Sequence, residues 1–105
     1  MENALTVAGM TVDSMIAIVN NFGYEPSLDT TNDIVKRKTI AVDATRRAAE
    51  KAVEACGGQG FLRPMGIESL WRDVQAGHFH PMQEKRQLLF TGSLAMGLEP
   101  PSQAF

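Results

Sequence analysis

Two groups of residues in this chain have the types and spacing to do chemistry. The first is a glycine-rich run made of Gly57, Gly58, Gln59 and Gly60. Backbone N–H groups without bulky side chains can approach an anion such as a pyrophosphate. The run does not match the dinucleotide-binding fingerprint, because its third glycine comes too soon and a helix, not a strand, precedes it. The residues alone therefore leave two interpretations, a plain helix cap and an anion-binding turn.

The second group is a pair of histidines, His78 and His80, which stand just before Pro81. Two histidines at this spacing can hold a metal when a third ligand approaches from elsewhere in the fold. No candidate for that third ligand stands out in the sequence, so we predict no metal site. Histidine side chains in general titrate near neutral pH, which makes His80 a candidate base. The alternative is a surface or packing role in a loop.

The composition bounds the class of protein. The chain has 105 residues, of which 44% are hydrophobic and 21% charged, and its net charge is -2. A single domain of this size buries little surface and is marginally stable, so we expect it to need a partner. With no basic excess to neutralise phosphates, nucleic acid is not an expected partner.

Other features bear on the location of the protein. Cys56 is the only cysteine, which excludes an internal disulfide and fits a reducing compartment such as the cytoplasm. The first basic residue is Lys36, so the N-terminal segment lacks the basic start of a signal peptide. Polar residues at 11, 13 and 14 interrupt the apolar run of that segment. We therefore expect a cytoplasmic protein without a membrane partner.

Helical periodicity predicts four helices, at about 3–21, from the polar residues 29–33 to Cys56, from Ile67 towards Gly77, and at about 82–96. The first is apolar around much of its circumference, which predicts that another subunit covers it. No segment alternates apolar and polar residues as a half-buried strand does. The predicted fold is an all-α antiparallel helical bundle over residues 1–99 with a flexible tail at 100–105, completed by oligomerisation.

The same periodicity predicts individual roles. Gly23 should end the first helix, and Trp71 should anchor the core. In the second helix, small residues repeat every seven positions and predict a narrow face for close packing, and Arg46 and Glu50 are spaced to form an ion pair. The residues of the fourth helix that we expect to be buried are Leu88, Leu89, Ala95 and Met96.

Two patterns stand in a fixed order in the stretch CGGQGFLRPMGIESLWRDVQAGHFHP, which runs from residue 56 to residue 81. The glycine-rich run and Phe61 match a G-G-x-G-[FY] turn at the end of a long helix. An E-x-x-[WY]-R-D pattern follows and is matched by Glu68, Trp71, Arg72 and Asp73. Together they resemble the C-terminal helical domain of the acyl-CoA dehydrogenase family, and the likeness extends weakly to most of the chain.

The resemblance implies that the glycine-rich run lies against the pyrophosphate of FAD, usually in a neighbouring subunit. FAD shared with another subunit is thus the expected cofactor. The expected partner is either a second copy in a homo-oligomer or a chain carrying the family's N-terminal and middle β domains, which are missing here. Family members have a glutamine three residues before the first glycine, whereas this chain has Glu54, whose carboxylate would repel a phosphate.

The resemblance also implies a change at the catalytic base. The family's proton-abstracting glutamate would fall at Pro81, which has no acid or base, so the chain should not oxidise acyl-CoA alone. Monooxygenase relatives often have a histidine close to His80. Three hypotheses follow: part of a flavin-dependent assembly that oxidises CH–CH groups of acyl-CoA, a subunit of a split flavin-dependent monooxygenase with His80 at the catalytic site, or a non-catalytic helical oligomerisation module.

Overall fold

One long helix forms the axis of the molecule, and the other helices pack along it. The computed structural model describes residues 1–101 and measures 49 × 27 × 20 Å. Four α-helices, joined by loops and short 3₁₀ turns, run over the following residues: α1 Glu2–Val19, α2 Leu28–Cys56, α3 Ile67–Val74 and α4 Glu84–Ala95. The described residues include no strand, which confirms the predicted all-α fold.

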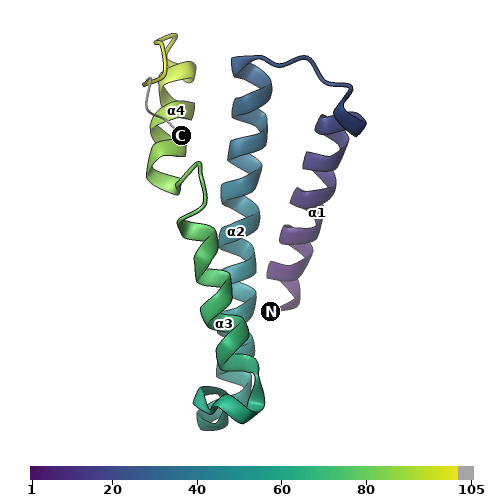
Figure 1. Ribbon diagram of the computed structural model, residues 1–105, viewed down its shortest axis with the longest axis vertical. Helices are drawn as coiled ribbons and strands as arrows, with labels where there is room; N and C mark the ends of the chain where they lie inside the picture. Colours follow the sequence, from purple (N-terminus) through teal and green to yellow (C-terminus); the bar gives the residue numbers. More distant parts are fainter. Residues whose placement is uncertain (102–105) are drawn as a thin grey trace.

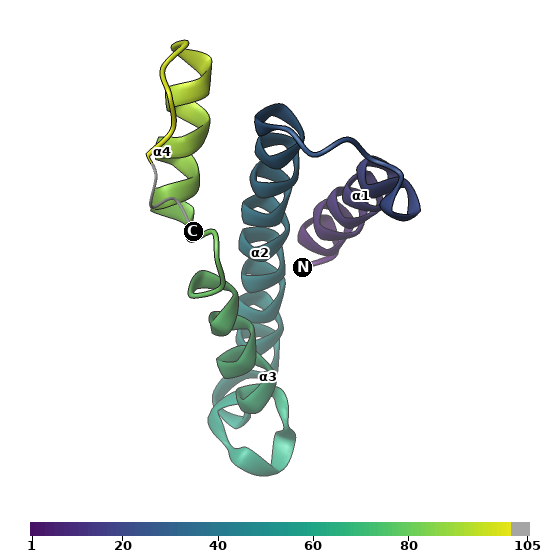
Figure 2. The same cartoon turned by 45° about the horizontal axis from the view of Figure 1, so that its top comes forward.

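The helices form an antiparallel arrangement around α2. Helix α1 runs up one side, α2 runs down, and α3 and α4 return up the other side, one after the other (Figure 1). Figure 2 shows the same order from another angle, with α1 and α4 on opposite sides of α2. Helix α3 lies beside the second half of α2, and α4 lies beside the first half. The two ends of the molecule therefore differ, with α3 at one end and α4 at the other.

The start of α2 is fixed by a side-chain cap. The Thr30 N–H donates to the Ser27 hydroxyl at 3.0 Å, which satisfies one of the free donors of the first turn. The cap lies just before the residues 29–33 that the sequence suggested for it. The end of α1 also differs from the prediction, because Asn20 takes the left-handed conformation there (φ 45°) and Gly23 does not. Asparagine tolerates this conformation better than most residues.

The contact between α1 and α2 depends on small side chains. Ala41, Ala44 and Ala48 are buried on α2, and the absence of bulk lets the two helices approach. This confirms the predicted small-residue face over its central turns, although Ala55 at its end is exposed.

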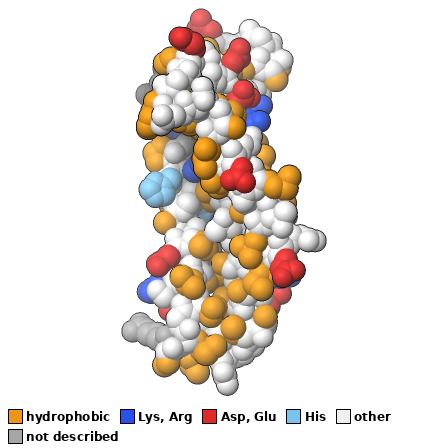
Figure 3. Space-filling model, turned by 90° about the vertical axis from the view of Figure 1, so that its right-hand side faces the viewer, with side chains coloured by type: hydrophobic (Ala, Val, Ile, Leu, Met, Phe, Trp, Pro, Cys, Tyr) orange, Lys and Arg blue, Asp and Glu red, His pale blue; other side chains and the backbone are white. Residues whose placement is uncertain are grey.

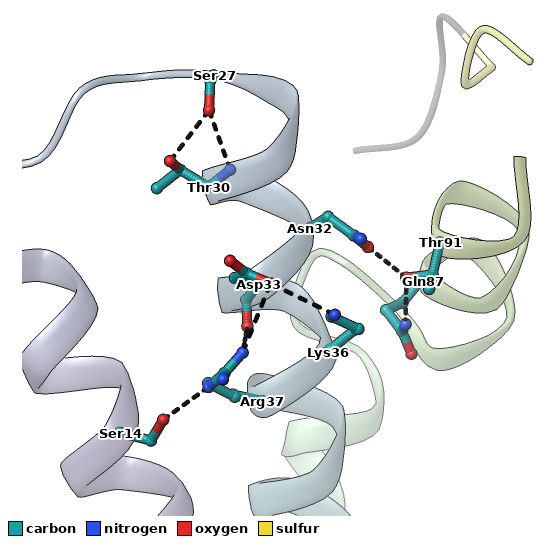
Figure 4. A network of polar contacts seen from close by, with 9 residues as sticks. All are labelled: Ser14, Ser27, Thr30, Asn32, Asp33, Lys36, Arg37, Gln87 and Thr91. Atoms are coloured by element: carbon teal, nitrogen blue, oxygen red, sulfur yellow. Dashed lines mark hydrogen bonds and ion pairs between the residues drawn. The ribbon is translucent and has the colours of Figure 1, made fainter. Parts of the chain in front are cut away.

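A second cluster attaches α4. Val35 of α2, Met82 and Phe90 are buried together, and Leu94 packs against them. Beside this cluster the Gln87 amide donates to Thr91, whose hydroxyl donates to the Asn32 side chain of α2 at 2.6 Å (Figure 4). These polar contacts fix which face of α4 meets α2.

The residues predicted to be buried in α4 are instead exposed. Leu88 and Leu89 are 59% and 57% exposed, Met96 is 77% exposed, and Ala95 is also exposed. Helix α4 has apolar residues on two sides, and periodicity does not show which side faces the core. The burial of Gln87 and Phe90 shows which side of α4 faces the core, because only their face can reach both Asn32 and Val35.

The substitution Gly92→Ala tests this orientation of α4. A Cβ at this position would meet no atom within 4 Å, so Gly92→Ala has room. Alanine loses less backbone entropy on folding, and we expect the free energy of unfolding to rise by about 0.5–1 kcal/mol. Urea denaturation followed by circular dichroism measures this change. A loss of stability would show that residue 92 is packed and that α4 is rotated differently.

Helix α1 packs on α2 along one side only, and the predicted cover of its other sides by another subunit stays a prediction. Figure 3 views the molecule from the α1 side and shows many hydrophobic side chains on this face, most of them in its lower half. Leu5 and Ile16 of α1 are exposed. By length and composition, the segment Glu2–Phe22 could cross a membrane. Core helices of soluble proteins and signal sequences share these properties, so one such helix is weak evidence of a membrane location.

Candidate functional site

The glycine-rich run ends α2 and folds into a 3₁₀ turn, Gly57–Phe61. Gly57 has φ 64° and ψ -149°, a conformation that only glycine adopts readily, so it stops the helix as predicted but not in the left-handed helical region. Gly60 is buried, and a Cβ there would lie 3.0 Å from the Val53 carbonyl oxygen. Glycine at 60 is therefore needed to pack the turn against α2.

A cavity of about 430 Å³ opens beside this turn. Two aromatic side chains form part of its wall: Phe61 is 75% exposed and Trp71 is 43% exposed. The prediction that Trp71 anchors the core is therefore wrong for the single chain, because the packing of α3 on α2 leaves much of the Trp71 side chain exposed. The residues that line this turn pocket are Glu50, Val53, Glu54, Gly60, Phe61, Glu68 and Trp71.

Three carboxylates give the turn pocket a negative charge. Glu54 pairs with Lys51 at 3.1 Å and Glu68 with Arg72 at 3.6 Å. Among the described residues the Glu50 side chain has no ion pair or hydrogen bond. The predicted Arg46–Glu50 pair does not form, because Arg46 turns towards α3 and donates to the Gln75 side chain at 3.1 Å.

This charge bears on the predicted FAD site. A pyrophosphate next to the turn would face the three carboxylates, and their repulsion opposes its binding. The side chain of Lys51, the nearby cation of α2, is already paired with Glu54. In a single chain the turn pocket therefore does not fit a pyrophosphate. Gly57, Gly58 and Gln59 are exposed at its edge, and their contact with a flavin held by another chain stays a prediction.

The histidine loop is held on α2 by one lysine. The Lys38 ammonium donates to the carbonyl oxygens of Gly77, His80 and Met82 at 2.9, 2.8 and 3.2 Å. All three of its N–H donors are thus used at once. Burial lowers the pKa of Lys38 below its ordinary value. The sequence analysis did not single out Lys38. Its position between Val35 and Ala41, on the packed face of α2, could have indicated that its ammonium group has a partner within the fold.

The side chains of the predicted histidines lie apart from the turn pocket. His80 is exposed and borders a cavity of about 330 Å³ with Asp73 and Thr45. The loop packs beside Val42, and Gly57 follows Val42 by fifteen positions along α2, about 22 Å at 1.5 Å per residue. One chain therefore does not bring His80 and the glycine-rich run into one site. Over the described part of the chain, no three metal-ligating side chains of the His, Cys, Asp or Glu type cluster together.

The comparison with known families decides the identity of this fold. The family model described as "Acyl-CoA dehydrogenase, C-terminal domain" matches residues 4–85, which is most of the chain. The chain belongs to this family. The match confirms the predicted resemblance and takes in α1, α2, the glycine-rich run, α3 and the histidine loop. Searches among curated proteins and among solved structures gave no significant match.

Membership of the acyl-CoA dehydrogenase C-terminal domain family connects the chain with flavin-dependent enzymes. The match reaches only the first turn of α4, so the part of this helix that carries Leu88, Leu89 and Met96 lies beyond the matched region. Pro81, at the position where the resemblance places the family's catalytic glutamate, is exposed in the loop that Lys38 holds. Proline cannot accept a proton from substrate carbon.

Proposed function

We propose that this acyl-CoA dehydrogenase-like domain is one part of a flavin-dependent oxidoreductase assembly that acts on CH–CH groups of acyl-CoA. The observation that carries the proposal is the family match over residues 4–85 of an all-helical fold. The exposed apolar side chains of α1 and α4 support a role beside other chains, because exposed patches of this kind usually mark contact surfaces.

The domain is not competent alone in this proposal. Hydride transfer to a flavin requires the substrate carbon, the flavin and a base to be held together with sub-ångström accuracy. The turn pocket carries the wrong charge for a pyrophosphate, and Pro81 supplies no base. Other chains must therefore provide most of the flavin site and the substrate site. Such an assembly would be cytoplasmic, because nothing in the composition requires another compartment.

The test begins with the purified chain and its visible absorption spectrum. We expect a colourless protein, no spectral change when FAD is added, and a native mass above that of a monomer. Adding an acyl-CoA dehydrogenase truncated before its C-terminal helical domain should then give flavin binding and turnover. Turnover by the chain alone would contradict the proposal, as would a mixture in which neither binding nor turnover appears.

A split monooxygenase is the second candidate function, and one observation favours it. The exposed His80 borders a cavity that also contains Asp73, so an imidazole and a carboxylate face the same space. In that case a His80→Ala variant would lose turnover in the assembly, whereas His78→Ala, its matched control, would keep it. Full turnover by His80→Ala would remove this candidate. If neither activity is found, the remaining interpretation is a non-catalytic helical oligomerisation module.

A further inference from the structure

The turn pocket has the size and the wall of a small-molecule site. Its cavity of about 430 Å³ falls within the range of pockets that hold small ligands. Phe61 and Trp71 line it and keep much of their surface exposed, so a molecule in the cavity can contact both aromatic side chains. A ligand that fits this wall has an apolar body.

The charge of the pocket selects the sign of such a ligand. Among the described side chains, the ionisable ones that line the cavity are Glu50, Glu54 and Glu68. Glu54 and Glu68 each have a basic partner, which leaves Glu50 as an unmatched negative charge. Glu54 also lies in the last turn of α2, where the helix end carries partial negative charge and no basic residue stands. A cation in the pocket would offset this charge.

The placement of the carboxylates distinguishes a metal ion from an organic cation. A hard metal ion needs several oxygen atoms at about 2.0–2.6 Å from one point. Over the described part of the chain, no three side chains of the His, Cys, Asp or Glu type come close enough together to hold one. The three glutamates thus border the cavity without converging on a point, and they attract a cation by charge alone.

The aromatic wall favours an ammonium group over other cations. The face of a tryptophan or phenylalanine ring attracts an ammonium group within about 6 Å of its centre. An amine with an apolar body therefore finds three favourable features in the turn pocket: a free carboxylate, an aromatic wall and enough space. The same carboxylates that oppose a pyrophosphate attract this ligand.

We propose that the turn pocket binds a small organic amine in its cationic form, with the ammonium group facing Glu50 and the apolar body against Phe61 and Trp71. This goes beyond the proposed function, because binding of the amine requires neither flavin nor a partner chain.

Three probes of similar shape and different charge test the proposal. They are the cation 2-phenylethylamine, the neutral 2-phenylethanol and the anion phenylacetate. Trp71 is the only tryptophan of the chain, so its fluorescence reports on the pocket directly. We expect a saturable change with the amine and a dissociation constant about tenfold below that of the alcohol, from one exposed ion pair and one cation–aromatic contact. Phenylacetate should give no saturable change.

Variants of the pocket assign the binding to its residues. Glu50→Gln keeps the shape of the side chain and should weaken binding of 2-phenylethylamine about fivefold, because the ion pair is lost. Phe61→Leu keeps an apolar side chain and should weaken it about threefold. Circular dichroism confirms that both variants are folded, as expected for exposed residues.

Glu25→Gln is the matched control, because it makes the same change of charge at an exposed residue before α2, at the opposite end of that helix (Figure 1). Binding of the amine should be unchanged in this variant. Equal affinity for the amine and the alcohol, a Glu50→Gln variant that binds as the unaltered chain does, or no saturable change with the amine would each overturn the proposal. The assay contains neither flavin nor a partner chain, so its failure and the failure of the proposed function are distinguishable.

Discussion

Lys38→Met is expected to lower the free energy of unfolding by about 3 kcal/mol. Methionine keeps the length of the side chain but has no donor for the carbonyl oxygens of Gly77, His80 and Met82. Hydrogen bonds from a charged donor contribute about 1.5–3 kcal/mol each when well shielded, and partial exposure of this site reduces the sum. For a marginally stable chain this is a large fraction of the total.

Urea denaturation measures the loss, and amide hydrogen exchange locates it. Exchange should accelerate in the histidine loop and at the start of α4, because Met82 belongs to the cluster that holds this helix. Amides between α1 and α2 should keep their protection. The matched control is Lys36→Met, which removes an exposed ion pair with Asp33 and should cost less than about 0.5 kcal/mol. Equal stability of the two variants would contradict the role of Lys38.

Gly77→Ala is expected to destabilise the fold by about 2 kcal/mol. A Cβ at residue 77 would lie 2.7 Å from one methyl carbon of Val42 and 3.1 Å from the other. Valine is branched at Cβ and has one strongly preferred rotamer in a helix, so it cannot turn away cheaply. Relieving such an overlap by shifting backbone costs about 1–3 kcal/mol. The end of α3 and the histidine loop should move away from α2.

The double variant Gly77→Ala with Val42→Ala should recover much of the loss, because the new methyl group then occupies space left by the valine. The free energies of unfolding of the two single variants and the double variant form a cycle that isolates this contact. Gly9→Ala in α1 is the control, since its Cβ would meet open space, and its stability should not fall. Additive losses in the cycle would show that Gly77 and Val42 are not in contact.

The two predictions concern the same feature of the molecule, the loop between α3 and α4. Gly77 allows the loop to approach α2, and Lys38 fixes it there through the carbonyl groups. The position of His80 depends on both. Turnover of the proposed monooxygenase would therefore respond to Lys38→Met as well as to His80→Ala.

The sequence by itself determined the helices, the position where α2 ends and the family. Helical periodicity is local, so the apolar and small residues of α2 specify its packing face without knowledge of the rest of the chain. Gly57 ends α2 because glycine alone tolerates the required dihedral angles. The two patterns between Cys56 and Pro81 indicate the family without a structure, because they consist only of residue types and their order along the chain.

Tertiary structure alone decided which faces meet and which charges remain unpaired. The hydrogen bond from Thr91 to Asn32, which orients α4, joins residues 59 positions apart, and the bond from Lys38 to Met82 spans 44 positions. Periodicity describes one helix at a time and carries no information about such contacts. For the same reason the exposure of Trp71, and the lack of an ion pair for Glu50 among the described residues, depend on how α3 packs on α2.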